Sequence, residues 1–387
     1  MRICHVAPEL LPVPPVKGGA IERWIRDAAQ RLASRGHDVH VVSRDHEDGE
    51  RERQIDGVQY HFVRIPPSLD RGRPAALFRG LSYFSGVGRI LGRLHPDVVH
   101  HHSRPAGAYL SGAFAGGARQ VISLHSMSYG WNFCYRAWDR VAFRKAFTAC
   151  ARVLCVSEFI RRHTLDLYPE LGGKTTTLYN GVDGALFHPD PAAGFDSGDD
   201  PTILFVGRVE ERKGVHLLVD AFERVIGRQA SGAKLKIVGP HSYWNAQPSP
   251  FYLALAARCR TIPRVELCGP TYVDADLAAV YRSATVGVVP SVFPEALGLT
   301  SLELQASGVP VVVSSAGGLP ETVRRGETGI VFENGDVDGL ASAVLDLLGD
   351  RRRLHAMRAA ARAWAMQQFS WDRIATQLET VYAQIAA

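Results

Sequence analysis

Short runs rich in β-branched residues alternate with longer helical patterns in both halves of this 387-residue chain. In the first half these runs include RICHVA (2–7), DVHVVS and RVLCVS, and in the second half they include TILFVG (202–207), VGVVPS and PVVVSS. Apolar strands that alternate with helices are typical of parallel sheets covered by helices on both faces. The sequence therefore predicts an α/β fold made of two doubly wound, Rossmann-like domains.

The domain boundaries are predicted from one stretch without periodicity. HPDPAAGFDSGDDP (188–201) is rich in Pro, Gly and Asp, which is typical of a linker. We therefore expect a first domain over 1–187 and a second over 202–369. The last segment, 370–387, has the pattern of an amphipathic helix that either finishes the second domain or crosses back to the first. Ligands of doubly wound sheets bind outside the carboxyl ends of the strands, so we expect a site in a cleft between the domains.

Charge and cysteine usage narrow the functional classes. The formal net charge is +5 and no basic run occurs, which fits a small anionic ligand and does not call for nucleic acid. The six cysteines form no CxxC pair and lie mostly in apolar stretches, as free buried thiols in a reducing compartment would. The start lacks the order of a signal peptide, and no apolar stretch is long enough to span a bilayer. We expect a cytoplasmic protein, and a homodimer stays open.

Two loops have the composition of phosphate-binding turns. KGGAIERW places Gly18 and Gly19 just before a helix, where unpaired N–H groups and the helix dipole favour an anion. FVGRVEERKG places Arg208 and Lys213 just after a strand, and two such cations suit a diphosphate. KGGAIERW is equally compatible with a plain loop before a helix, and it does not match the dinucleotide fingerprint GxGxxG. For FVGRVEERKG taken alone, surface arginines before a helix are the favoured interpretation.

Histidines gather near the predicted strand ends, at His5, at 100–102 and at His125. Successive residues of a strand point to opposite faces, so the three histidines of 100–102 cannot all converge on a metal. His125 ends an apolar run and precedes small polar residues, so it either lines a cleft or is a structural histidine. Pairs of aspartates elsewhere precede helices or lie in loops, where they act as caps. We expect no metal site.

Two further stretches leave their meaning open. PEALGLTSLE (294–303) holds two glutamates eight residues apart with Gly298 between them, and on a helix they would be about 80° out of register. FRGLSYFSGVGRILGRLHP (78–96) has an apolar side formed by Phe78, Leu81, Phe84, Val87, Leu91 and Leu94, with arginines elsewhere. Such a helix packs on a core, which we favour, or lies on an anionic membrane.

The order of these motifs resembles the retaining glycosyltransferases of family 4, which have the GT-B fold. The resemblance spans nearly the whole chain and includes NGVD (180–183), GR-x4-KG, PEALGLTSLE and SSAGGLPE. It implies that Glu303 holds the ribose and Glu295 the transferred sugar of a nucleotide sugar, and that the final helix crosses back to the first domain. The implied donor site also contains Gly19, Arg208, Lys213, Val238, Gly239, Ala296, Leu297, Gly298, Leu299 and Thr300.

The resemblance also implies a mechanism. His125 would lie beside the anomeric carbon, and Arg208 and Lys213 would neutralise the departing diphosphate. These cations and a helix dipole would do the electrostatic work without a metal or other cofactor. Retention in this family is ascribed to front-face attack, in which the leaving phosphate helps to deprotonate the acceptor, so no enzymic nucleophile is needed.

The acceptor is suggested by two loops of the first half. LHSMSYGWNFCYRAWDR and VHHHSRPAGAY resemble the branch that glycosylates 2-deoxystreptamine in actinobacterial aminoglycoside pathways of the kanamycin and tobramycin type. That resemblance implies UDP-glucose or UDP-N-acetylglucosamine as the donor. The candidate acceptor-binding residues are Glu9, Gly18, His101, Tyr129, Trp131 and Asp139.

Three alternatives stay open. One is a family 4 enzyme acting on a lipid or cell-envelope acceptor, which the 78–96 helix motivates. The second is a UDP-sugar epimerase, and the third is a nucleotide-sugar-binding protein without transfer activity.

Overall fold

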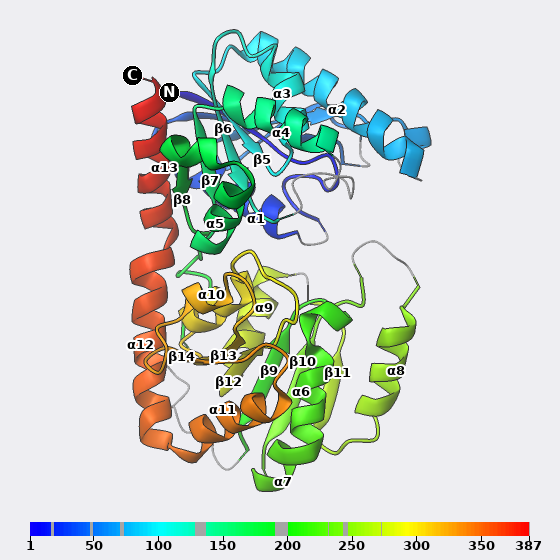
Figure 1. Cartoon of the computed structure of the whole chain (residues 1–387), viewed down its shortest axis with the longest axis vertical. Coiled ribbons are helices and arrows are strands. Elements are labelled where there is room, and N and C mark those ends of the chain that lie inside the picture. The colour runs from blue at the N-terminus through cyan, green and yellow to red at the C-terminus, as the bar shows by residue number, and fades with distance from the viewer. Residues whose placement is uncertain are drawn as a thin grey trace. The chain divides into compact units, whose positions relative to one another are not determined.

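The structure is a computed structural model that describes residues 1–16, 19–46, 49–69, 73–127, 137–189, 200–230, 232–242, 247–271 and 273–386. Its internal contacts divide the chain into two compact units (Figure 1). Unit 1 consists of Met1–Asn180 and Trp371–Ala387, and unit 2 consists of Gly181–Ser370. Each unit is an α/β domain built on one largely parallel sheet, which confirms the predicted fold class.

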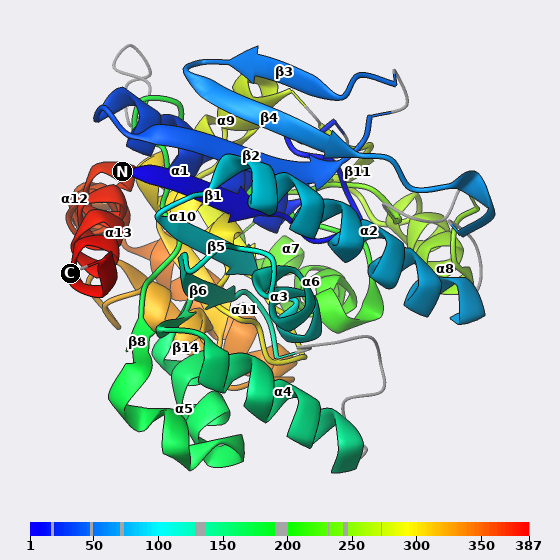
Figure 2. The same cartoon turned by 90° about the horizontal axis from the view of Figure 1, so that it is seen from above.

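Unit 1 is built on an eight-stranded sheet with the order β3-β4-β2-β1-β5-β6-β7-β8. Figure 2 shows the strands from β3 to β6 side by side in this order. All pairs are parallel except β3 with β4. The strands are β1 (Arg2–Val6), β2 (Asp38–Arg44), β3 (Glu52–Ile55), β4 (Val58–Val63), β5 (Val98–His102), β6 (Arg119–Leu124), β7 (Arg152–Cys155) and β8 (Thr175–Thr177).

Helices cover both faces of this sheet. One face carries α1 (Ala20–Ser34) and α13 (Trp371–Ala386), and alternate strand residues such as Ile3, Val41 and Val121 pack beneath them. The other face carries α2 (Arg73–Leu94), and the intervening residues, among them Val42 and Val99, pack there. The remaining helices of the unit are α3 (Pro105–Gly112), α4 (Ala137–Ala149) and α5 (Glu158–Leu167).

Helix α13 packs on α1, which confirms that the C-terminal helix crosses back to the first domain. Its buried residues Ile374, Leu378, Tyr382 and Ile385 recur at helical spacing and belong to the core of unit 1. At its first residue, the Trp371 ring meets the Trp24 ring of α1 edge to face, with centroids 5.6 Å apart. Apolar burial along one stripe therefore attaches this last segment to the first domain.

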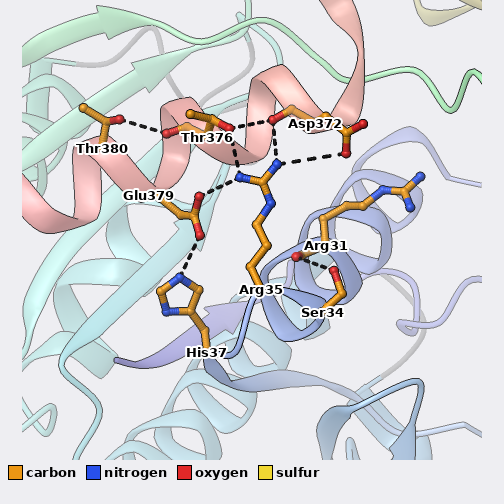
Figure 3. Close-up of polar contacts among 8 residues, drawn as sticks. All are labelled: Arg31, Ser34, Arg35, His37, Asp372, Thr376, Glu379 and Thr380. Carbon is orange, nitrogen blue, oxygen red and sulfur yellow. Dashed lines mark hydrogen bonds and ion pairs between the residues drawn. The ribbon is translucent and has the colours of Figure 1, made fainter.

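A polar cluster fixes the register of α13 on unit 1 (Figure 3). Arg35, just after α1, donates to Glu379 Oε2 at 2.6 Å and to the Asp372 carbonyl at 2.8 Å. His37 Nε2 lies 3.0 Å from Glu379 Oε1. Burial alone would raise the pKa of Glu379, but the hydrogen bonds of Arg35 and His37 hold it below its usual value.

Unit 2 is built on a six-stranded, fully parallel sheet with the order β11-β10-β9-β12-β13-β14. The strands are β9 (Thr202–Val206), β10 (Lys234–Val238), β11 (Val265–Cys268), β12 (Val286–Val289), β13 (Val311–Ser314) and β14 (Gly329–Phe332). The helices are α6 (Val215–Ala221), α7 (Gly227–Gln229), α8 (Pro250–Cys259), α9 (Asp274–Arg282), α10 (Leu299–Ala306), α11 (Val337–Gly349) and α12 (Arg351–Phe369). A buried apolar cluster that includes Phe205, Ile237, Val288 and Leu340 holds the sheet and its helices together.

The chain leaves unit 1 earlier than the expected linker 188–201, of which 190–199 lie outside the described residues. Val182 N donates to Phe369 O at 2.7 Å, and Arg362 Nη1 of α12 donates to Phe187 O at 2.6 Å. These bonds fix 181–189 on unit 2, although the sequence placed residues up to 187 in the first domain. Backbone capture by a distant arginine has no local sequence signal, which explains the difference.

Helix α2 matches the predicted amphipathic helix only in part. Phe84, Val87 and Leu91 are buried against the sheet as expected, whereas Phe78 and Leu81 are 58% and 42% exposed. The first turns of the apolar side therefore do not pack on the core. Among the described residues, no helix is long and apolar enough to cross a membrane.

The cysteine prediction is confirmed where the structure describes it. Cys4, Cys150, Cys155 and Cys259 are free and buried, and Cys268 is free and half-buried. Burial raises the pKa of the Cys150 and Cys155 thiols to about 12. Cys134 lies outside the described residues.

The Arg35–Glu379 contact predicts an acid-dependent loss of stability. The pKa of Glu379 is lower in the folded protein than in the unfolded chain, where it is about 4.3. The contribution of Glu379 to folding stability is therefore fully present above the unfolded pKa and is lost as pH falls through the folded pKa. Glu379→Gln should cost about 1 kcal/mol at pH 7, seen as a lower Tm of the transition of unit 1. The deficit should shrink near pH 3.5, below the usual carboxyl pKa.

Asp372→Asn is the matched control for this prediction. The Asp372 side chain is exposed and lies 4.0 Å from Arg35, which it holds chiefly through its main-chain carbonyl. The Tm of the Asp372→Asn variant should stay within about 1 °C of that of the wild type, because exposed ion pairs contribute little to stability. An equal deficit in both variants would contradict the assignment to Glu379.

Candidate functional site

At the carboxyl ends of β9 and β10, the chain segments contact each other through backbone hydrogen bonds. Gly207 N donates to Val238 O at 3.0 Å, and Val209 N donates to Pro240 O at 2.9 Å. Gly239 has a φ of 150°, and a Cβ there would clash with the Gly207 carbonyl. Glycine is therefore required where the two loops cross, and the loop that carries Arg208 is fixed against Val238 and Gly239.

Three cations follow β9, and two acids hold them. Arg208 Nη1 and Arg212 Nε donate to the two carboxylate oxygens of Glu210, each at 2.6 Å. Lys213 Nζ donates to Glu295 Oε1 at 2.5 Å, although the two residues are 82 positions apart. The structure therefore brings together Lys213 and Glu295, two of the residues that the resemblance assigns to one donor site. Glu210 was missed, although an acid between two cations in RVEERKG is a readable signal.

Glu295 is held from both its backbone and its side chain. Gly318 N donates to the Glu295 carbonyl at 2.8 Å, and Gly317 pairs with Glu295 as an isolated bridge. Gly317 has a φ of 65°, and a Cβ there would clash with the Glu295 backbone. Ser291 Oγ donates to the Oε1 that also accepts from Lys213, at 2.7 Å. The SSAGG loop thus fixes the orientation of Glu295.

Helix α10 begins at Gly298 without a side-chain cap. Gly298 adopts a φ of 105°, and a Cβ there would clash with the Leu319 side chain. Because no side chain accepts from the first turn, the N–H groups of Leu299 and Thr300 and the positive dipole end are available to an anion. Leu297 is buried and Ala296 half-buried just before this turn, so they shape the loop.

Glu303 lies in the second turn of α10 and is 5% exposed. The Tyr281 hydroxyl of α9 donates to Glu303 Oε2 at 2.6 Å. The two glutamates of PEALGLTSLE therefore take the expected positions, one in the loop and one inside the helix. Tyr281 orients the second of them, and no local pattern in the sequence marks it for that role.

In unit 1, Gly19 caps α1 with a φ of 117°, and Arg23 N donates to its carbonyl at 3.0 Å. A Cβ on Gly19 would clash with the Glu22 carboxylate, which the sequence did not single out. Burial raises the pKa of Glu22 to about 7, against its own backbone hydrogen bond and the charge of Arg104. Gly18 lies outside the described residues.

Four histidines cluster on the α1 face of the sheet. His5, His100 and His102 are fully buried side chains, and His125 just after β6 is partly exposed. Ring nitrogens of His5, His100 and His102 lie within 4.8 Å of one another, close enough to be considered as metal ligands. Burial lowers the pKa of His5 and His125 to about 3 and that of His100 and His102 well below 6.5, so all four are neutral.

The other expected acceptor residues are either buried or lie outside the described part of the chain. His101 points to the opposite face of the sheet from His100 and His102 and is 1% exposed, so it offers no surface to an acceptor in this structure. Glu9 is fully buried and accepts from Arg104 Nε at 2.9 Å. Tyr129 and Trp131 lie outside the described residues, as does the side chain of Asp139.

Comparisons with known proteins identify the family. Residues 18–185 match the sequence model of Glycosyltransferase Family 4, and residues 200–350 match that of Glycosyl transferases group 1. A GDP-mannose-dependent alpha-(1-6)-phosphatidylinositol monomannoside mannosyltransferase of Mycobacterium tuberculosis is 30% identical over 381 residues, covering 94% of each chain. The chain belongs to glycosyltransferase family 4. Spore coat protein SA of Bacillus subtilis is a further relative of this glycosyltransferase, 27% identical over 99% of both chains.

Solved structures agree with the GT-B fold of this glycosyltransferase. Sucrose-phosphate synthase from Thermosynechococcus elongatus aligns with a TM-score of 0.82 at 20% identity, over 99% of each chain. Anabaena Alr3699/HepE in complex with UDP-glucose aligns with a TM-score of 0.74 at 18% identity, over 99% of this chain and all of the other.

The backbone at Gly298 generates a test of the anion site in this glycosyltransferase. Gly298→Ala places a Cβ on a backbone with a φ of 105°, which L residues rarely adopt, and against the Leu319 side chain. We therefore expect the first turn of α10 and its N–H groups to shift. We expect affinity for a nucleoside diphosphate, measured by calorimetry, to fall about 10-fold, since one charge-assisted hydrogen bond is worth roughly that factor.

Gly335→Ala is the control. Gly335 also has a positive φ, of 83°, but a Cβ there meets nothing within 4 Å. The variant should lose about 1 kcal/mol of stability and keep its nucleotide affinity. Equal losses of nucleotide affinity in the two variants would contradict an anion site at the start of α10.

Proposed function

We propose that this enzyme transfers a hexose with retention from a nucleoside diphosphate sugar to a hydroxyl group of its acceptor. The observation that carries the proposal is the contact between Lys213 and Glu295, 2.5 Å apart beside the uncapped start of α10. It joins a phosphate-binding cation to a sugar-binding acid, the two roles that the family motifs imply. Family membership supports the transferase class, and the site supports the nucleotide-sugar donor.

The chemistry follows from charge placement. As the glycosidic bond breaks, negative charge grows on the diphosphate, where Arg208, Lys213 and the first amides of α10 would stabilise it. Glu295 would accept from hydroxyls of the sugar, and Glu303, held by Tyr281, from those of the ribose. The leaving phosphate would take the proton of the attacking hydroxyl on the same face of the sugar. Two cations and a helix start suffice for this, so we expect transfer without a metal.

The specific hypothesis is transfer of glucose or N-acetylglucosamine from its UDP conjugate to 2-deoxystreptamine, which gives an α-linked pseudodisaccharide. The loops LHSMSYGWNFCYRAWDR and VHHHSRPAGAY support this acceptor by resemblance. A structural relative, Anabaena Alr3699/HepE, is in complex with UDP-glucose, which supports the donor. The relative from Mycobacterium tuberculosis uses GDP-mannose, so the nucleotide must be tested directly.

A donor and acceptor matrix tests this hypothesis. The purified full-length enzyme is incubated with UDP-glucose, UDP-N-acetylglucosamine or GDP-mannose, with and without 2-deoxystreptamine and with EDTA in parallel. We expect a pseudodisaccharide by mass spectrometry from a UDP-sugar only, at an unchanged rate in EDTA. Its NMR spectrum should show the small H1–H2 coupling of an equatorial anomeric proton, as an α-linkage requires. A product formed from GDP-mannose and from neither UDP-sugar would contradict the hypothesis that the donor is a UDP-sugar. Interconversion of UDP-sugars without acceptor would indicate an epimerase.

One observation favours a second candidate, transfer to a lipid acceptor. Helices α2, α3 and α4 contact one another in sequence and carry large exposed apolar side chains. These are Phe78, Leu81, Tyr109, Leu110 and Val141, with Phe114 just after α3. The relative from Mycobacterium tuberculosis acts on a phosphatidylinositol monomannoside. Sedimentation with anionic liposomes at low salt, lost in Phe78→Ser/Phe114→Ser, would favour this candidate, and no sedimentation would exclude it.

The two arginines of the β9 loop give a matched test of leaving-group stabilisation. Arg208 is 21% exposed and Arg212 49% exposed in their side chains, and both pair with Glu210. Arg208→Ala should lower kcat by roughly 10²-fold, as removal of one electrostatic stabiliser does, whereas Arg212→Ala should change it less than about 3-fold. Initial rates at saturating donor measure both. Equal rates in the two folded variants would contradict the role of Arg208.

A further inference from the structure

Three histidines form a hydrogen-bonded chain inside unit 1. His5 Nδ1 on β1 lies 3.2 Å from His102 Nε2 at the end of β5, and His102 Nδ1 lies 3.0 Å from His125 Nε2 just after β6. The parallel register explains the arrangement, because His5 pairs with His100 and His102 pairs with Ser123 on neighbouring strands. Every second residue of β5 thus faces the same side as His5.

The chain runs from the buried interior toward the surface. His5 and His102 are 0% and 1% exposed, and His125 is partly exposed. The Trp24 ring of α1 packs against His5, His102 and His125, with centroids 5.1–6.4 Å away. His125 N also donates to Ser103 Oγ at 3.0 Å, which fixes its main chain.

Among the described residues, the side chains that contact these histidine rings carry no charge. From the sheet the histidine chain is faced by His100 and Ser123, from α1 by Trp24 and from α13 by Tyr382. Burial keeps the three imidazoles neutral, with the pKa of His5 and His125 lowered to about 3 and that of His102 well below 6.5.

A neutral imidazole carries one N–H and one lone pair, so such a chain has a direction. Either all three protons are on Nδ1, and each ring donates toward His125, or all three are on Nε2, and each donates toward His5. His5 Nε2 has no partner among the described residues, and neither has the nearby Nε1–H of Trp24. Protons on Nε2 would therefore bury a second orphaned N–H in this pocket, and buried orphaned N–H groups are rare.

His100 stands outside the chain. Its Nδ1 lies 2.6 Å from the Tyr382 hydroxyl, and its Nε2 lies 2.7 Å from Ser123 Oγ, so both nitrogens are occupied. The rings of His5, His100 and His102 are inclined by only 22–37° and stacked with centroids 4.4–5.4 Å apart. A metal bound by these three side chains would have to displace these hydrogen bonds, so we interpret the cluster as a hydrogen-bonded chain.

We propose that His5 and His102 are positioning residues that hold His125 as the Nδ1–H tautomer, which then presents an uncharged N–H donor at the outer end of the chain. The role of that donor rests on the proposed function and on the place beside the anomeric carbon that the family resemblance implies for His125. There it would donate to a sugar oxygen without adding positive charge next to an oxocarbenium-like centre. A protonated, cationic histidine would repel that centre.

The tautomer is measured directly on the full-length protein. With ¹⁵N-histidine labelling, long-range ¹H–¹⁵N spectra distinguish Nδ1–H from Nε2–H, and His125→Asn assigns the His125 signals by their loss. We expect Nδ1–H for His5, His102 and His125 in the wild type, between pH 6 and 8. An Nε2–H tautomer of His125 would overturn the proposal. So would elemental analysis that finds one zinc ion per protein molecule. This measurement uses His125→Asn only to assign signals, and it needs no substrate.

Two substitutions of His102 then separate positioning from packing. In His102→Asn the side-chain amide can donate from near the former Nδ1, whereas His102→Leu keeps volume and removes the donor. The leucine variant should turn His125 into a mixture of tautomers and lower kcat about 10-fold at unchanged KM for the donor, as loss of one oriented donor does. The asparagine variant should restore both readouts to within about 3-fold.

The two hypotheses fail in different ways. An unchanged tautomer in His102→Leu would overturn the positioning role whatever the activity. Absence of transfer from every donor, with the expected spectra, would instead overturn the proposed function and leave the tautomer assignment standing.

Discussion

Parallel strand pairing is the constraint on which the rest of this structure depends. In unit 2, the charged residues of the candidate site lie beyond the carboxyl ends of buried parallel strands, where the chain turns into the next helix. In unit 2 these turns approach one another so closely that Gly207 and Gly239 meet backbone to backbone, and Gly214 meets the Pro290 carbonyl. A side chain at Gly239 or Gly214 would clash with the carbonyl it faces, and so it would displace the loops that carry Arg208 and Lys213.

The ion pair between Lys213 and Glu295 offsets the desolvation of two charged side chains that a binding site requires. Both side chains are mostly buried, at 21% and 13% exposure, so each would pay for desolvation if it were alone. Paired, and with Ser291 donating to the same oxygen, the two side chains hold one another in place. In the proposed function, an arriving diphosphate would then meet a lysine that is already fixed. This preorganisation lowers the entropy that binding must offset.

Much of this architecture could be predicted from the sequence, because apolar strands, helix periodicity and glycine turns are local signals. The positions of Glu295 and Glu303 were implied by the family resemblance that one ten-residue stretch carries. Three strands were missed, Glu52–Ile55, Thr175–Thr177 and Gly329–Phe332. The first lies at the sheet edge and has little apolar pattern, since its residues are half-buried or exposed. The roles of Tyr281 and Ser291 as hydrogen-bond donors were not predicted for another reason. A hydroxyl takes such a role only when tertiary packing brings a carboxylate next to it.

The buried histidines show how far such tertiary roles can differ from sequence expectation. Alternation along β5 was foreseen, and it excludes convergence of all of 100–102, yet it also aligns His100 and His102 with His5 on the neighbouring strand. Polar rings in this core would be costly without partners, and hydrogen bonds to Tyr382, Ser123 and one another offset that cost. Since Tyr382 belongs to α13, the returning helix completes the polar core beneath His125. The C-terminal segment thus contributes to unit 1 through a specific hydrogen bond as well as through apolar burial.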